Sequence, residues 1–225
     1  MGKLFDVVKD MAKSFRFLLP LAFICLVIYL FYAHFTKVDA MKTVEDIQYM
    51  TKKVREDRQE IAFINFNNDT MVYSNFLPID LKSRMTDNGY IIKSRFGTVI
   101  NFIESYKTPE EKAYYADKSN RYKGTEAYII TFPHIRRSAC MHLAQVDWRA
   151  KVPNFMGIEV GRTNEENPNI GVERLSLGIL EGENEIKYNG PDKSFVANRK
   201  LHYKEAFKAC HCLVHNKCVV SLKFY

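Results

Sequence analysis

Residues 17–35 read FLLPLAFICLVIYLFYAHF and carry no formally charged side chain. As a helix with a rise of about 1.5 Å per residue, this segment would span about 28 Å, close to the hydrocarbon thickness of a bilayer. A buried core helix and a cleavable signal peptide are the alternatives. The run is longer than the usual apolar part of a signal peptide, and Lys37-Val-Asp39 follows it in place of a small-residue cleavage site. We therefore predict an uncleaved signal anchor.

The flanking charges predict the orientation of this anchor. Residues 1–16 hold four basic and two acidic side chains, and positively charged flanks of a membrane span stay in the cytoplasm. The prediction is a basic amphipathic cytoplasmic tail (1–16), a transmembrane helix in contact with the lipid bilayer (17–35), an amphipathic helical extension (36–64) and a head on the far side of the membrane (65–225).

A second helical pattern covers residues 38–62, where apolar side chains recur at helical spacing. The stripe consists of Met41, Val44, Ile47, Met50, Val54 and Ile61. No Gly or Pro lies between Pro20 and Pro78, so the membrane helix is expected to continue into this one without a break. We expect an assembly face of Met41, Val44, Ile47 and Val54 to contact the head or another subunit.

The rest of the chain reads mainly as strands. Segments rich in β-branched and aromatic residues lie at 90–103, 127–132, 155–160, 175–180 and 219–224. The first is broken at Gly97 and is either a strand with a bulge or two short strands. A short helix carrying Cys140 is predicted to begin at Pro133. The fold class predicted from this order is α+β: a long N-terminal helix, first transmembrane and then amphipathic, packed on a small antiparallel-sheet head.

Cysteine usage predicts disulfides that close the head. Apart from Cys25 in the apolar segment, the cysteines are Cys140, Cys210, Cys212 and Cys218, an even number beyond a membrane span. Cys210 and Cys212 lie only two residues apart, and we expect them to have different partners. Of the two pairings that remain, the preferred one is Cys140–Cys210 with Cys212–Cys218. The alternative is a zinc site of Cys210, Cys212, His215 and Cys218.

The sequence shows no motif of a common enzyme class: no phosphate-binding loop, HExxH or GxSxG is present. The prediction is a non-enzymatic protein without a cofactor. Its net charge of +7 is unevenly distributed, since residues 159–185 hold seven acidic and two basic side chains and residues 193–223 hold seven basic and one acidic. Such blocks can pair between subunits. Basic residues close to Tyr and Phe also suggest a nucleic-acid contact as an alternative; these are Arg136, Arg137, Lys200, Lys204 and Lys208.

Several strings resemble type IV pilins, specifically the type IVb class. Asn75-Phe-Leu-Pro78, Asn88-Gly89 and Arg95-Phe-Gly-Thr-Val-Ile100 resemble the passage from the pilin helix into the sheet. The stretch from Tyr128 to Leu143 resembles the strand, turn and short helix that bear the first disulfide cysteine. Ala209-Cys210, Asn216 and the stretch from Val219 to Tyr225 resemble the closing segment. The resemblance covers about residues 38–225 and implies a disulfide Cys140–Cys210, with Cys212–Cys218 as an additional local link.

The N-terminus departs from the family pattern, in which a Gly directly precedes an apolar run with Glu at its fifth position. Here Lys3 follows Gly2, and cleavage after Gly2 would place Val7 at the fifth position. The first Glu of the chain is Glu45. The resemblance therefore implies a non-standard pilin-like protein: a minor or initiating subunit, or a head that stays anchored in the bacterial inner membrane and faces the periplasm, with other pilin-like or secretion-apparatus subunits, including copies of itself, as partners.

Overall fold

The computed structural model describes residues 2–60, 66–107, 127–162, 187–189, 194–212 and 218–225. The chain divides into two compact units, residues 1–38 and residues 39–225. Helix α1 (Gly2–Glu60) is continuous and supplies residues to both units, with Pro20 inside it. The apolar and amphipathic patterns of the sequence thus lie on one helix, as their lack of Gly and further Pro predicts.

In the first unit, the apolar side chains of α1 lie open to the surroundings. From Leu18 to Phe35, the large hydrophobic side chains are exposed. Within residues 18–57, α1 is long and apolar enough to cross a membrane, judged by length and composition alone. None of its most apolar stretch is buried. A helix that is apolar on all sides and uncovered by protein is typical of a lipid-facing segment.

The second unit is built around one antiparallel sheet. In chain order its described strands are β1 (Ser83–Thr86), β2 (Gly89–Lys93), β3 (Val99–Ser105), β4 (Ala127–Ile135), β5 (Phe155–Arg162), β6 (Lys187–Asn189), β7 (Ser194–Ala197) and β8 (Cys218–Phe224). In space their order is β1-β2-β3-β4-β8-β5-β7-β6. The prediction of an α+β fold with a long N-terminal helix and an antiparallel sheet is confirmed.

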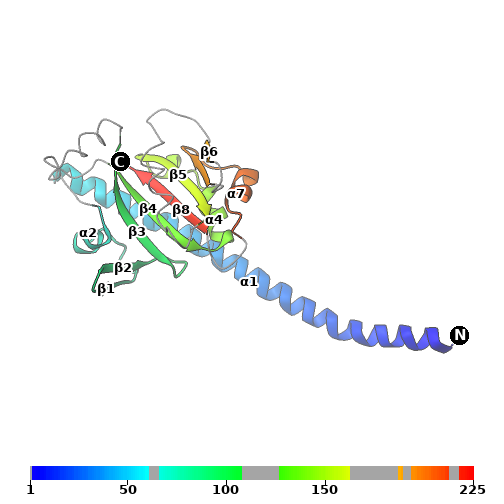
Figure 1. Ribbon diagram of the computed structural model, residues 1–225. Coiled ribbons are helices and arrows are strands. Elements are labelled where there is room, and N and C mark those ends of the chain that lie inside the picture. Colours follow the sequence, from blue (N-terminus) through cyan, green and yellow to red (C-terminus); the bar gives the residue numbers. More distant parts are fainter. Residues whose placement is uncertain (1, 61–65, 108–126, 163–186, 190–193, 213–217) are drawn as a thin grey trace. The chain divides into compact units, whose positions relative to one another are not determined.

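Strand β8 lies between β4 and β5 and joins the two halves of the sheet (Figure 1). Ile130 of β4 and Ile158 of β5 both pair with Leu222 of β8. All residues of β8 are buried, including Ser221 and Lys223 between its apolar side chains.

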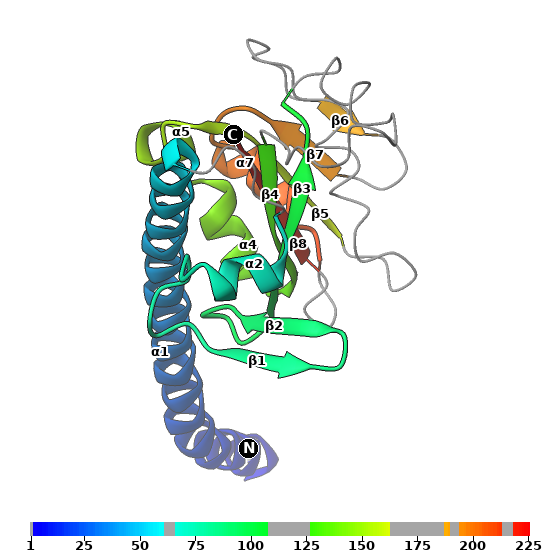
Figure 2. The same ribbon diagram turned by 90° about the vertical axis from the view of Figure 1, so that its left-hand side faces the viewer.

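One face of the sheet packs against helices (Figure 2). Three α1 residues, Ile47, Met50 and Val54, share a core with Tyr128 of β4 and Leu222 of β8. The short helices α2 (Asn68–Tyr73), α4 (Arg137–Ala144) and α7 (Tyr203–Ala209) add buried side chains to the same core, and Trp148 of α5 (Trp148–Lys151) is fully buried there. Residues 39–60 of α1 therefore form part of the head.

One local prediction needs correction, and the structure decides between two alternatives at another place. The helix after β4 begins at Arg137 and not at Pro133, because β4 continues through Pro133 to Ile135. A register shift between Phe132 and Ile135, with His134 at φ 56°, accommodates the proline, which has no N–H for the ladder. Of the two alternatives at 90–103, a bulged strand or two short strands, the structure shows the second: β2 and β3 are joined by a turn at Gly97 with φ 77°. The strand predicted at 175–180 falls outside the described residues.

Candidate assembly and binding surfaces

The proposed assembly face of α1 divides into a buried and an exposed part. Ile47 and Val54 are buried in the core of the head, and Val44 is partly buried against it. Met41 is 58% exposed. The structure therefore places Ile47 and Val54 against the head, whereas Met41 faces outward.

Polar residues complete the buried face of α1, and the apolar pattern alone did not reveal them. Thr43 and Thr51 are 2% and 3% exposed, and each hydroxyl donates to a carbonyl one turn earlier, of Asp39 and Ile47, at 2.8 Å. Such bonds satisfy a buried hydroxyl within its own helix. The available signal was the helical spacing, since residue 43 continues the 47, 50, 54 repeat.

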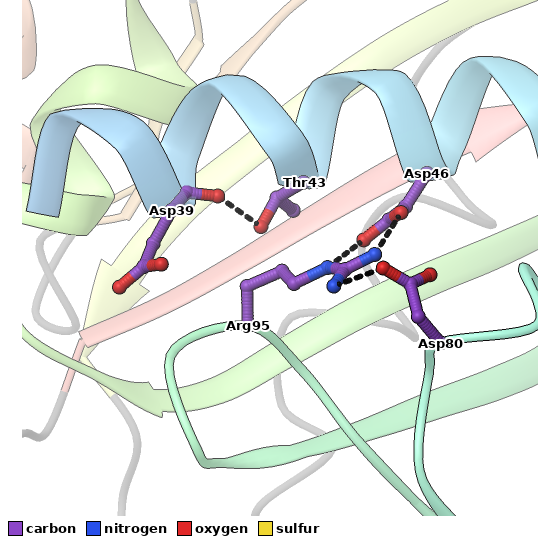
Figure 3. A network of polar contacts seen from close by, with 5 residues as sticks. All are labelled: Asp39, Thr43, Asp46, Asp80 and Arg95. Carbon is purple, nitrogen blue, oxygen red and sulfur yellow. Dashed lines mark hydrogen bonds and ion pairs between the residues drawn. The ribbon is translucent and has the colours of Figure 1, made fainter. Parts of the chain in front are cut away.

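Arg95 connects the turn between β2 and β3 to helix α1 (Figure 3). Its Nε and Nη2 donate to the two carboxylate oxygens of Asp46 at 2.7 and 2.8 Å. Its Nη1 lies 2.7 Å from Oδ2 of Asp80, in the segment before β1. The side chains of Arg95 and Asp46 are only 18% and 9% exposed, so this bidentate pair is largely shielded from water.

The two carboxylates differ in their surroundings. Asp80 is 61% exposed at its side chain, and the hydrogen bond from Arg95 lowers its pKa below the usual aspartate range. The two acids together raise the pKa of Arg95 above its ordinary value. Arg95 therefore stays charged and does not act as an acid or base. Its contacts fix the turn between β2 and β3 to helix α1.

The four cysteines of the head form one buried cluster. The sulfur atoms of Cys140 and Cys210, and those of Cys212 and Cys218, lie at disulfide distance, in the pairing preferred from the sequence. The Cα atoms are 5.9 Å apart in the first pair and 5.3 Å in the second. The first pair links α4 to the residue that ends α7. Cys25 is exposed and carries a free thiol.

The cysteine cluster also bears on the zinc alternative. The Sγ atoms of Cys140, Cys212 and Cys218 lie within 4.8 Å of one another. His215 lies outside the described residues. Among the described residues, the cysteines that could bind one metal ion thus include Cys140, which the sequence analysis assigned only to a disulfide. A zinc site and the two cysteine pairs would use the same sulfur atoms, so they exclude each other.

Basic and aromatic side chains meet where α4 and α7 pack together, forming what we call the α4–α7 surface. The guanidinium of Arg137 lies over the ring of Phe207 at 4.1 Å, and the rings of Phe207 and Tyr203 are 6.2 Å apart. Tyr203 and Phe207 are 65% and 45% exposed. The remaining basic residues predicted from the sequence, Arg136, Lys200, Lys204 and Lys208, are all exposed.

An ion pair supports the α4–α7 surface. Arg199 binds Glu205 through two nitrogens at 3.0 and 3.1 Å, and Glu205 also accepts from the backbone N–H of His202 at 2.8 Å. These contacts cap the start of α7. The hydrogen bond from Arg199 lowers the pKa of Glu205. Because Arg199 is neutralised in this way, the exposed lysines and Arg136 supply the positive charge of the surface.

No protein-family model and no curated protein sequence matches this chain. Among solved structures, it is similar to a crystal structure of type IVb pilin from Salmonella typhi. The TM-score is 0.49 and the sequence identity 9%, over 80% of this chain and 96% of the pilin chain.

Proposed function

We propose that the protein is a membrane-anchored, non-enzymatic, pilin-like structural subunit of a bacterial type IV pilus, secretion or conjugation apparatus. The observation that carries the proposal is helix α1. Its apolar residues from Leu18 to Phe35 are exposed, whereas Ile47, Met50 and Val54 of the same helix are core residues of the head. A head-bound helix with an uncovered apolar segment can use that segment for lipid and for the helices of neighbouring subunits.

The proposed location is the bacterial inner membrane, with residues 1–16 in the cytoplasm and the head in the periplasm. The basic excess of residues 1–16 supports this orientation. The cysteines at disulfide distance support an oxidising compartment for the head. Protease added to cells with a permeabilised outer membrane should digest the head and leave an epitope at the N-terminus intact. Protection of the head would contradict this orientation.

Assembly can be tested with the chain's own free thiol. Cys25 is exposed on α1, so oxidation of native membranes should give a covalent dimer on a non-reducing gel if the helices of two subunits adjoin. Cys25→Ser is the matched control and should give no dimer. A monomer in the wild-type protein, under oxidation that cross-links a known membrane dimer, would count against assembly through this helix.

The α4–α7 surface supports a second candidate function, binding of single-stranded nucleic acid in DNA uptake or transfer. Exposed Tyr203 and Phe207 offer rings on which bases can stack, and exposed lysines offer contacts to phosphate. The competing interpretation is contact with the acidic block of a neighbouring subunit.

A salt titration with labelled oligo(dT) separates these two uses. Binding should weaken steeply with salt, and Lys204→Ala with Lys208→Ala should reduce the slope by about 0.7 for each of these lysines that neutralises a phosphate. Tyr203→Ala should lower the affinity and leave the slope unchanged, because stacking releases no counterions. Absence of binding at low salt would remove this candidate.

A further inference from the structure

A pocket of about 210 Å³ opens between helix α1 and the segment that connects α5 to β5. Its polar lining comes from Gln48, Thr51, Lys52 and Arg55 of α1 and from Lys151 and Asn154 on the facing segment. All of these residues belong to the head unit. Pockets for cofactors and drug-sized ligands usually measure about 300–1,000 Å³, so this volume suits one or two side chains of a partner.

The walls of the pocket are fixed by hydrogen bonds. Nε2 of Gln48 donates to the carbonyl oxygen of Lys151 at 3.1 Å and so bridges the two walls. The side-chain amide of Asn154 donates to the carbonyl oxygen of Tyr225, and the backbone carbonyl of Asn154 accepts from the N–H of Tyr225 at 3.1 Å. Thr51 is buried and bonded within α1. The neutral polar groups are thus used in building the pocket, and the cationic groups remain for a ligand.

The charge of the pocket is positive. Lys52, Arg55 and Lys151 are exposed at its rim. Lys52 is 3.7 Å from Glu56 in an exposed pair, which is worth little in water. Within the described part of the chain, no ion pair is found for Arg55 or Lys151. A pocket rimmed by an arginine and two lysines suits carboxylate groups, which a guanidinium binds in a bidentate manner.

We propose that this pocket binds glutamate side chains of a second copy of the chain, from residues 163–186. The argument is charge complementarity: that segment holds six glutamates and one arginine, whereas the pocket rim holds three cations and Glu56 as a neighbour. The inference rests on the proposed assembly function and names its partner surface. In this arrangement, the acidic segment 163–186 of one subunit binds the α1 pocket of the next subunit.

The direct test uses full-length protein in detergent and a labelled peptide of residues 163–186. The wild-type protein should bind the peptide saturably, and Arg55→Glu with Lys151→Glu should weaken binding at least tenfold. Arg84→Glu with Lys93→Glu makes the same charge change at exposed residues of β1 and β2 and is the matched control, expected to bind like the wild type. Unchanged melting temperatures would show that both variants are folded.

Two further arms make the result specific. A peptide with its six glutamates changed to lysine should bind poorly to the wild type and regain binding to the Arg55→Glu, Lys151→Glu variant. If both variant pairs weaken peptide binding equally, the pocket proposal is wrong, because binding would then depend only on the net charge of the protein. Inorganic phosphate that displaces the peptide far better than chloride at equal ionic strength would overturn the peptide as ligand in favour of a phosphate site.

The outcome is separable from that of the assembly proposal. If the peptide fails to bind while Cys25 still forms a covalent dimer in membranes, the pocket inference is wrong and assembly stands. If the peptide binds but no dimer forms through Cys25, the pocket is a real acidic-peptide site and the helix-to-helix assembly is wrong.

Discussion

Arg95 and Asp46, which are 49 residues apart in sequence, share two hydrogen bonds of 2.7 and 2.8 Å and thereby join a sheet turn to helix α1. The helix that carries the apolar segment is thus fastened to the head by an oriented charge pair as well as by core packing. The pair therefore fixes the position of the β2–β3 turn on α1.

Asp46→Asn should destabilise the head by about 2 kcal/mol, since it leaves a largely shielded guanidinium with only part of its acceptor set. The measurement is the melting temperature of the purified protein. Lys53→Ala, which removes a contact with exposed Glu56 at 3.4 Å, is the control and should change the stability by less than about 0.5 kcal/mol. An effect of Asp46→Asn no larger than that of the control would mean that the pair is not holding the head.

Buried and exposed residues of α1 should separate stability from assembly. Ile47→Ala should cost about 3 kcal/mol because it opens a cavity in the core. Met41→Ala should leave the melting temperature almost unchanged, because Met41 is 58% exposed, and should reduce dimer formation through Cys25. A stable Met41→Ala protein with normal cross-linking would remove Met41 from the assembly face.

The two cysteine pairs should differ in their contribution to stability. Chain entropy assigns about 4 kcal/mol to a loop as long as the 70-residue Cys140–Cys210 separation and about 2 kcal/mol to the six-residue Cys212–Cys218 separation. Replacing the first pair with alanine should therefore lower the melting temperature and the steady-state amount more than replacing the second. Neither change should affect membrane insertion. Normal abundance without Cys140 and Cys210 would contradict a structural disulfide.

The closeness of the sulfur atoms also predicts exchange of partners. In Cys210→Ser, the sulfur of Cys140 remains within 4.8 Å of those of Cys212 and Cys218. A thiolate of Cys140 can then attack the Cys212–Cys218 bond, form a new bond to one sulfur and release the other as a thiolate. Peptide mapping by mass spectrometry under non-reducing conditions should find Cys140 bonded to Cys212 or Cys218. Recovery of Cys140 only as a free thiol would show that exchange does not occur.

Acid should weaken the ion pair between Arg199 and Glu205 that stabilises the start of α7. The pKa of Glu205 is lower in the folded protein than in the unfolded chain because Arg199 binds its charged form. Its contribution is therefore complete above the ordinary glutamate pKa of about 4.3 and is lost as the pH falls from there through the lower folded value. The melting-temperature difference between wild type and Glu205→Gln should shrink over that range. In an Arg199→Gln background the difference should vary little with pH, and a persistent variation would point to another group.

The parts of the fold that the sequence predicted are those with a local cause. Strands β5 and β8 are apolar and β-branched over much of their length, and α1 lacks helix-breaking residues across its second half. Helix α7 was missed because seven residues are too few for an isolated helix. Its stability comes from burial of Ala206 and Ala209 and from the Arg199–Glu205 pair. The capping contact of Glu205 with His202 was the one local signal.

The candidate surfaces were predicted in composition but not in arrangement. The basic residues of the α4–α7 surface were identified, yet the stacking of Arg137 on Phe207 joins positions about 70 residues apart and depends on how α4 meets α7. The α1 pocket gave no sequence signal, since Arg55 and Lys151 lie on segments that only the tertiary fold brings together. The ion pairs of Arg95 with Asp46 and Asp80 could not be predicted for the same reason.

The position of β8 has a consequence for how the head is made. Strands β4 and β5 have no ladder pairing with each other, and each presents an open edge until residues 218–224 fill the gap. The ribosome and any translocation machinery deliver those residues after every other described strand. The two halves of the sheet therefore cannot join before residues 218–224 have been made, and until then the open edges of β4 and β5 can pair with other strands. A premature stop before Cys218 would leave the edges of β4 and β5 unpaired and open to strands of other molecules.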